Sequence, residues 1–230
     1  MTMYAVTNHL YPKDEFFDKL IAGFAADRGP AITDKWRATR FEMRGPLSGN
    51  EFISTSVWED SDAFDAWRSS QDIQTSHRNV DYEMFSRRAA LSFHDVLMNA
   101  APGRAPIAGQ AERYERLGVG ALESLLYFHP KAEHIDDVVK ALEAEGAPTA
   151  PGLVWWEIWK DVKGNRWWNI TYWESREAYD AAKTAGCPQL SLPGDPSWYE
   201  QEAEEALYLM ELERLPGFAQ IERREAVAGV

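Results

Sequence analysis

One sequence unit occurs twice in this chain, and the two copies are separated by half the length of the chain. The segment FISTSVWEDSDAFDAW at residues 52–67 returns as WWNITYWESREAYDAA at residues 167–182. The dipeptide Trp58-Glu59 then falls on Trp173-Glu174, an offset of 115 in a chain of 230 residues. Because about 100 residues is an ordinary domain size, the repeat predicts two tandem domains of one fold.

Hydrophobic periodicity predicts the same order of elements in each copy. In the first copy we expect strands at 3–10, 32–43, 51–58 and 89–98, a helix from about residue 13 to Gly29-Pro30 and a helix from Ser61. In the second copy we expect strands at 122–129, 153–160, 166–173 and 206–212, a helix opened by Pro130 and a helix at 176–184. The order strand, helix, strand, strand, helix, strand is typical of the ferredoxin-like fold.

The predicted fold class is α+β, with two tandem ferredoxin-like (βαββαβ) domains. Each sheet carries helices on one face only, so we expect the two bare faces to pack together as an intramolecular dimeric α/β barrel. We place one domain at 1–99, a linker rich in Pro, Gly and Ala at 100–120, a second domain at 121–215 and a tail at 216–230. A chain that supplies both halves itself predicts a monomer (a pseudo-dimer) or a weak homo-oligomer.

Composition excludes several classes of protein. A formal net charge of −13 argues against a nucleic-acid partner, which requires clustered cations. No apolar run approaches the roughly 18 residues of a membrane span, and the N-terminus lacks the pattern of a signal peptide. We therefore expect a cytoplasmic protein without a membrane partner. Ten tryptophans either fill the core or line a pocket for a planar ligand.

Three residues of the first copy stand out as a candidate site. Asn8 interrupts a strand face that it shares with Tyr4 and Val6, Trp67 lies on the inward face of the second helix, and His77 follows ten residues later. Singly, each has an ordinary explanation: a hydrogen-bonded amide, a core indole and a surface imidazole. They converge only if the chain bends between residues 69 and 75, because ten helical steps would turn His77 away from Trp67.

Together these residues carry a resemblance to a known family. AVTNHL holds Asn8, VWEDSDAFDAW holds Trp67 and SHRN holds His77. Over residues 3–98 the first copy resembles the antibiotic-biosynthesis-monooxygenase superfamily, and within it the heme-degrading monooxygenases of the staphylococcal Isd type. That resemblance implies a heme site in the first domain, with heme as both cofactor and substrate.

The resemblance also implies a role for each residue. His77 is the axial ligand of the heme iron, Asn8 donates a hydrogen bond on the opposite side of the ring, and Trp67 presses on the porphyrin and distorts it. Phe64 joins Trp67 in contacting the ring, and Arg87 and Arg88 are candidates to pair with the propionates. Oxygen then opens the porphyrin and iron is released. Because the sequence has no flavin or nicotinamide motif, the electrons come from an external donor, such as a reductase.

Three other functions stay open at this stage. The chain is alternatively a heme-dependent enzyme that acts on another small molecule, or a non-catalytic heme carrier. It is also compatible with a cofactor-free monooxygenase that oxidises an aromatic substrate, with His77 as a base.

The second copy lacks the candidate residues. Trp67 falls on Ala182, and His77 falls near Leu192. Asn8 falls near Glu123 by the fixed offset, or on Leu126 if the prolines that open the helices are matched. We therefore expect one working site per chain and a structural role for the second domain.

Overall fold

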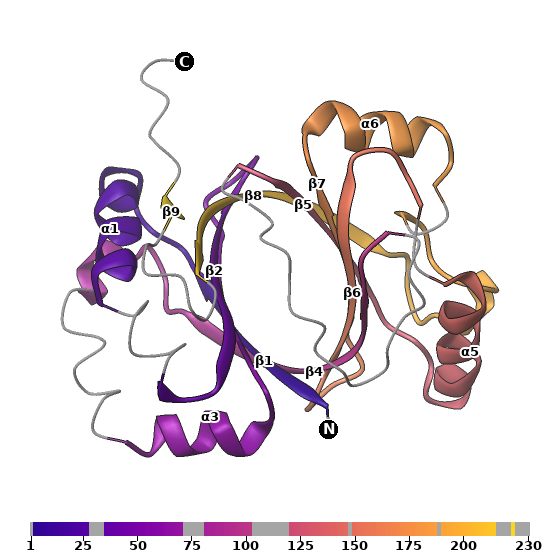
Figure 1. Ribbon diagram of the computed structural model, residues 1–230, viewed down its shortest axis with the longest axis horizontal. Helices are drawn as coiled ribbons and strands as arrows, with labels where there is room; N and C mark the ends of the chain where they lie inside the picture. The colour runs from indigo at the N-terminus through magenta and orange to yellow at the C-terminus, as the bar shows by residue number, and fades with distance from the viewer. Residues whose placement is uncertain are drawn as a thin grey trace. The chain divides into compact units, whose positions relative to one another are not determined.

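The computed structural model in Figure 1 describes residues 2–27, 35–70, 81–102, 120–146, 149–187, 190–214 and 222–223. The chain forms two compact units. The first unit consists of Tyr4–Ser92, Gly118–Gly120 and Leu209–Val230, and the second of Met1–Met3, Phe93–Leu117 and Ala121–Tyr208.

The elements of the two sequence repeats follow the predicted order. The first repeat has strands β1 (Met3–Leu10), β2 (Ala38–Pro46), β3 (Phe52–Trp58) and β4 (Ala90–Ala100), with helices α1 (Phe17–Asp27) and α3 (Ser61–Arg68). The second has strands β5 (Leu122–Phe128), β6 (Leu153–Asp161), β7 (Trp167–Trp173) and β8 (Glu204–Arg214), with helices α5 (Ile135–Glu145) and α6 (Arg176–Thr184). A short strand β9 (Glu222–Arg223) pairs with the end of β8. The α+β class and the tandem βαββαβ order are confirmed.

The fourth strand of each repeat takes part in both units. In the first unit the order of paired strands is β8-β2-β3-β1-β4, and in the second it is β4-β6-β7-β5-β8. Strand β8 is longer than the predicted 206–212, and it pairs with β5, β2 and β9. Strand β2 also pairs with β8.

Strand β2 differs from the prediction at both ends. We expected it at 32–43, with Gly45-Pro46 in a turn, but it spans Ala38–Pro46. A Cβ atom at Gly45 would lie only 3.0 Å from Glu211 Oε1 of β8, so glycine permits the two strands to approach each other. This extension depends on a partner strand more than 160 residues away in the sequence, which local periodicity cannot reveal.

The helix starts confirm that the repeat is structural. Ser61 was the predicted cap of α3, but it is the first helical residue, and Asp60 caps the helix by accepting a hydrogen bond from the Ala63 amide at 2.7 Å. Ser175 caps α6 by accepting one from the Ala178 amide at 3.2 Å. Each cap oxygen relieves a backbone donor that has no partner inside the helix. The two caps are separated by the same 115 residues as the repeated Trp-Glu pair.

Alternation along β2 divides the first unit into two layers. Phe41 and Met43 pack with Leu20, Ile21 and Phe24 of α1. The residues that alternate with Phe41 and Met43 along β2 point to the opposite face. They are Arg40, Glu42 and Arg44, and none has measurable exposure. Glu42 forms ion pairs with Arg40 Nε at 2.7 Å and with Arg44 Nη2 at 2.6 Å. A carboxylate flanked by two guanidinium groups compensates the cost of burying these charges.

Removing the charge of Glu42 should destabilise the fold strongly. Glu42→Gln keeps the side-chain shape but leaves two buried guanidinium groups without this carboxylate, and we expect a loss of about 3–5 kcal/mol in the free energy of unfolding. Urea denaturation measures the change. The matched control is Glu59→Gln, which breaks a half-exposed ion pair with Arg37 at 3.5 Å and should change the free energy by about 0.5 kcal/mol or less. Equal effects of the two variants would contradict the role assigned to Glu42.

Candidate functional site

The register between β1 and β3 places Asn8 directly opposite Ser54. Asn8 is half-buried, and its Nδ2 donates a hydrogen bond to Ser54 Oγ at 3.3 Å. Ser54 is buried, with 1% exposure. This bond sets the rotation of the amide, so that one of its two hydrogens is committed and the direction of the other is fixed.

An aromatic cluster of Tyr4, Trp58, Phe64 and Trp67 lies on the same face of the sheet. The Trp58 ring lies 5.6 Å from Phe64 and 5.3 Å from Trp67, and the Tyr4 ring lies 5.8 Å from Phe64. Phe64 and Trp67 are 6% and 8% exposed, and their rings are 5.9 Å apart. The Trp58 indole donates to Ser56 Oγ at 2.9 Å, which holds the ring at the centre of the cluster.

Strand alternation places the Asn8 amide and the aromatic cluster on one face of the sheet. Tyr4 and Asn8 are four residues apart on β1, and Ser54, Ser56 and Trp58 alternate along β3, so all five side chains share one face. Helix α3 covers this face through Phe64 and Trp67. We call it the Asn8 face. Flat apolar rings beside a few fixed polar groups suit a planar ligand that carries one or more polar atoms.

The structure describes five of the predicted site residues, and only three of them lie on the Asn8 face. The Asn8 face brings together Asn8, Phe64 and Trp67. Arg87 and Arg88 are exposed, and the Arg87 guanidinium lies 3.4 Å from the centre of the Tyr11 ring. His77 lies outside the described residues, so its place in the site stays a prediction.

The sequence prediction missed Ser54 and Ser56. Both are polar residues on β3 in line with Phe52 and Trp58, so they carry the same signal that made Asn8 conspicuous: a polar position on an otherwise apolar strand face. Matching β3 against β1 would have identified them. Their hydroxyl groups position Asn8 and Trp58 respectively.

The second repeat has a different set of side chains at the equivalent positions. Leu126 pairs with Asn169, which lies 115 residues after Ser54, so the register assigns Leu126 and not Glu123 as the counterpart of Asn8. Ala182 is the counterpart of Trp67 on helix α6, where it is buried. An apolar side chain and a methyl group thus replace the amide and the indole.

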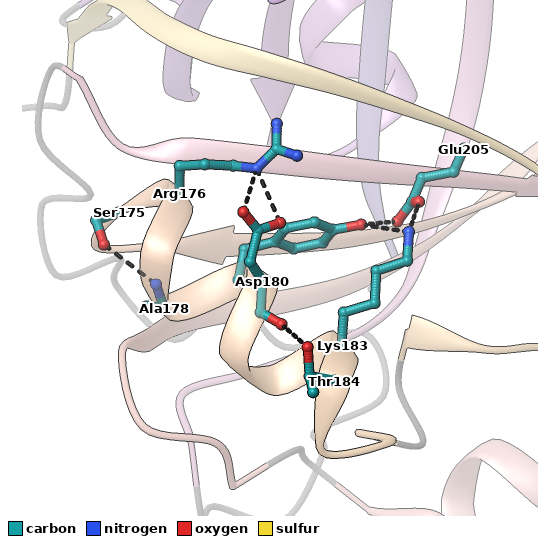
Figure 2. Close-up of polar contacts among 8 residues, drawn as sticks. Ser175, Arg176, Ala178, Asp180, Lys183, Thr184 and Glu205 are labelled. Carbon is teal, nitrogen blue, oxygen red and sulfur yellow. Dashed lines mark hydrogen bonds and ion pairs between the residues drawn. The ribbon is translucent and has the colours of Figure 1, made fainter.

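A polar network replaces the candidate site in this repeat. The Glu205 carboxylate of β8 accepts hydrogen bonds from Ser124 Oγ at 3.0 Å and Tyr179 OH at 2.5 Å, and it forms an ion pair with Lys183. Lys183 also donates to Tyr179 OH at 2.9 Å. Figure 2 shows the Lys183 and Glu205 side chains pointing toward each other, from α6 and β8. The network fastens α6 to β5 and β8.

These contacts shift the pKa values of Tyr179, Glu205 and Lys183. Burial and the bond to Glu205 raise the pKa of the Tyr179 phenol, so the phenol stays a hydrogen-bond donor. Burial opposes ionisation of Glu205, but the bonds from Lys183, Tyr179 and Ser124 outweigh it and lower the pKa of that carboxyl. The same bonds to Glu205 and Tyr179 raise the pKa of Lys183. The ion pair therefore persists at neutral pH.

Among the described residues, no cluster of three His, Cys, Asp or Glu side chains is arranged to hold a metal ion. Heme iron requires only one axial side chain from the protein. No helix in the described part of the chain is long and apolar enough to span a membrane.

The Glu205 network should make stability depend on pH. Because the carboxyl pKa is lower in the folded state, its contribution is present above the unfolded value of about 4.3 and is lost as pH falls through the folded value. Because the Lys183 side chain is 54% exposed and solvent screens the ion pair, we expect Glu205→Gln to cost about 1 kcal/mol at pH 7 and progressively less below pH ~4. Urea denaturation across this range measures the difference from wild type. Glu204→Gln, at the exposed neighbouring position, is the control; a cost for Glu205→Gln that is constant with pH would contradict this account.

Comparisons with known proteins agree with the tandem fold. A statistical model of the antibiotic biosynthesis monooxygenase family matches residues 3–79 and 124–186, one segment in each repeat. Among solved structures, an anthrone oxidase-like protein has a TM-score of 0.65 and 13% identity, over 100% of this chain and 97% of its own. A protein from Lactobacillus acidophilus NCFM, provisionally assigned as a monooxygenase, has a TM-score of 0.61 and 11% identity, over 98% and 100%.

A heme-degrading enzyme from Listeria monocytogenes has 12% identity over 90% of this chain and 98% of its own, with a TM-score of 0.43. No curated protein sequence matches the chain. The TM-scores above 0.6 show that this chain shares its fold with the anthrone oxidase-like protein and the Lactobacillus acidophilus protein, and identities this low carry no information about the substrate. The family match covers more than half of the chain and falls on both repeats, and the chain therefore belongs to the antibiotic biosynthesis monooxygenase family.

Proposed function

We propose that this chain is a monooxygenase that binds heme on the Asn8 face, opens the porphyrin ring and releases the iron. The observation that carries the proposal is that the Asn8 amide lies on the same face of β1 and β3 as the aromatic cluster, whose rings α3 contacts through Phe64 and Trp67. Oxygen is the co-substrate, and an external reductase supplies the electrons. The reaction belongs in the cytoplasm, and the second domain completes the fold without a site of its own.

The residues of the Asn8 face fit a porphyrin. Trp67 and Phe64 offer flat apolar surface to the macrocycle, and Trp58 and Tyr4 support them from behind. Asn8 has a second amide hydrogen to offer a polar atom of the bound group, since Ser54 takes only one. His77 is the proposed iron ligand, by its match to the family motif. The exposed guanidinium groups of Arg87 and Arg88 are the proposed partners of the propionates.

Bound heme supplies an iron at which oxygen is activated and a ring that is itself oxidised. The protein contributes fixed geometry. The Ser54 hydroxyl holds the Asn8 amide in one rotation, so its free N–H needs little reorganisation to donate. The aromatic cluster prevents Trp67 from turning away when a planar ligand presses on it, and its apolar surface excludes water.

A second candidate is the cofactor-free oxidation of a polycyclic aromatic substrate. The observation that favours it is the pair of serine hydroxyls, Ser54 and Ser56, that share a face with Asn8. Three neutral polar groups beside aromatic rings suit a phenol or quinone, and His77 would then act as the base. The fold similarity to an anthrone oxidase-like protein is compatible with this candidate.

Hemin titration separates the two candidates. Adding hemin to the apoprotein should give a Soret band that saturates at one heme per chain, because the second repeat lacks the site residues. His77→Ala should remove or shift that band. Oxygen with a reductant should then bleach the band and release chelatable iron. A wild-type protein that stays colourless would rule out heme, and a Soret band that survives oxygen and reductant would leave a heme carrier or another heme-dependent enzyme.

The second repeat provides a matched control for Asn8. Asn8→Leu introduces the residue found at the equivalent position, keeps heme bound through His77 and should slow the bleaching about 10²-fold or more, as expected for a lost preorganised donor. Leu126→Asn places an amide in the repeat that lacks Trp67, and it should change neither binding nor rate. Single-turnover absorbance traces measure both variants. An unchanged rate in Asn8→Leu would refute the assigned role.

A further inference from the structure

A second cluster of polar side chains lies on the opposite face of β1, where Thr7 and His9 point away from Asn8. His9 Nδ1 lies 2.9 Å from Glu51 Oε1, and His9 Nε2 lies 3.3 Å from Ser92 Oγ. Tyr11 OH donates to the same Glu51 oxygen at 2.5 Å, and Ser92 Oγ lies 2.5 Å from Thr7 Oγ1. We call Glu51, His9 and Ser92 the Glu51 relay.

The chemistry of these groups permits one chain of hydrogen bonds that runs from Thr7 through Ser92 and His9 to Glu51. An ionised carboxylate can only accept, so both Tyr11 OH and His9 Nδ1 donate to Glu51. Burial and the bond to Glu51 raise the pKa of the Tyr11 phenol, so Tyr11 keeps its proton. A neutral imidazole with hydrogen on Nδ1 has its lone pair on Nε2, which then accepts the Ser92 hydroxyl hydrogen. Thr7 can donate to Ser92 Oγ without competing for that lone pair.

We propose that the Glu51 relay makes Ser92 a nucleophile that hydrolyses small activated carboxylic esters. A carboxylate that orients a histidine, and a histidine that accepts the hydrogen of a serine, form the arrangement of a catalytic triad, which is recognised by geometry and not by sequence order. Strand pairing assembles it here: His9 comes from β1, Glu51 immediately precedes β3, and Ser92 lies near the start of β4.

The position of Ser92 suits a small substrate. Ser92 is half-buried, whereas its neighbour Leu91 is 59% exposed. Along β4, exposed residues at the beginning of the strand give way to buried residues from His94 onward. His9 is 8% exposed and Thr7 has no measurable exposure, so the base is shielded from bulk water, whereas Ser92 is half-buried.

The reaction balances with water as the only other reactant. Ser92 Oγ forms a bond to the ester carbonyl carbon as its proton passes to His9 Nε2. The bond from that carbon to the alkoxy oxygen breaks, and the leaving alcohol takes the proton from His9. Water then attacks the acyl-serine, with His9 again as the base, and releases the carboxylic acid and free Ser92. The reaction needs neither heme nor a reductant, so it does not depend on the proposed monooxygenase function.

Two probes test the proposal on the full chain. With p-nitrophenyl acetate, wild type should release nitrophenol at least ten times faster than Ser92→Ala, His9→Gln or Glu51→Gln, since an aligned general base contributes about 10²–10⁴-fold. A fluorophosphonate should add one adduct to wild type by intact mass, and peptide mapping should locate it on Ser92. Ser61→Ala removes an exposed serine hydroxyl on α3 and should behave as wild type.

Ser92→Cys keeps a nucleophile beside His9 and should react with p-nitrophenyl acetate, which shows that the loss in Ser92→Ala is chemical and not a failure to fold. The proposal is overturned if wild type and Ser92→Ala release nitrophenol at the same rate. It is also overturned if wild type gains no fluorophosphonate adduct, or gains one on another residue. If Ser92→Ala does not fold, the rates of His9→Gln and Ser92→Cys decide in the same way.

Discussion

The antiparallel register between β1 and β3 is the constraint on which both the Asn8 face and the Glu51 relay depend. Side chains alternate along a strand, so a slip of one residue would exchange the two faces of β1. Asn8 would then leave the face that carries the aromatic cluster, and His9 would take its place on that face. Leu10 opposite Phe52 at one end of the pair and Tyr4 opposite Trp58 at the other are large apolar pairs that oppose such a slip.

The two repeats keep the scaffold and change its polar contents. Trp58 donates to Ser56 in the first repeat, and Trp173 donates to Thr171 at the equivalent position in the second, at 2.8 Å. Glu42 and Glu157 also correspond, and both are fully buried. Glu42 is flanked by Arg40 and Arg44, whereas the corresponding neighbours of Glu157 are Trp155 and Trp159.

The Trp155 indole donates to Glu157 at 3.1 Å, so an uncharged donor serves where the first repeat uses a guanidinium. This substitution explains part of the unusual tryptophan content. Several indoles of the second repeat are core side chains that also act as hydrogen-bond donors, including Trp156, whose Nε1 donates to Asn169 Oδ1 at 2.8 Å. The aromatic cluster of the first repeat is a candidate ligand-binding surface, whereas the indoles of the second repeat fill its core and donate hydrogen bonds.

Sequence periodicity predicted the elements but not the long-range contacts. The offset of 115 identified the repeat, and the caps at Asp60 and Ser175 follow it. The predicted C-terminal end of β2 was wrong because the strand continues to Pro46 beside β8. Asn8 was visible as a polar residue on an apolar face, but the Glu51 relay was not, because His9 and Ser92 are 83 residues apart and no motif links them.

Strands β4 and β8 have a consequence for how the chain is made. In the first half alone, β2 would lack β8 and β4 would lack β6, so both edges of its sheet would be unpaired. Synthesis of residues 1–100 therefore produces a sheet that cannot be completed until the second half emerges. The first half of a nascent chain is exposed to pairing with another copy during that interval, and covalent linkage of the repeats favours the correct partner by keeping it at high local concentration.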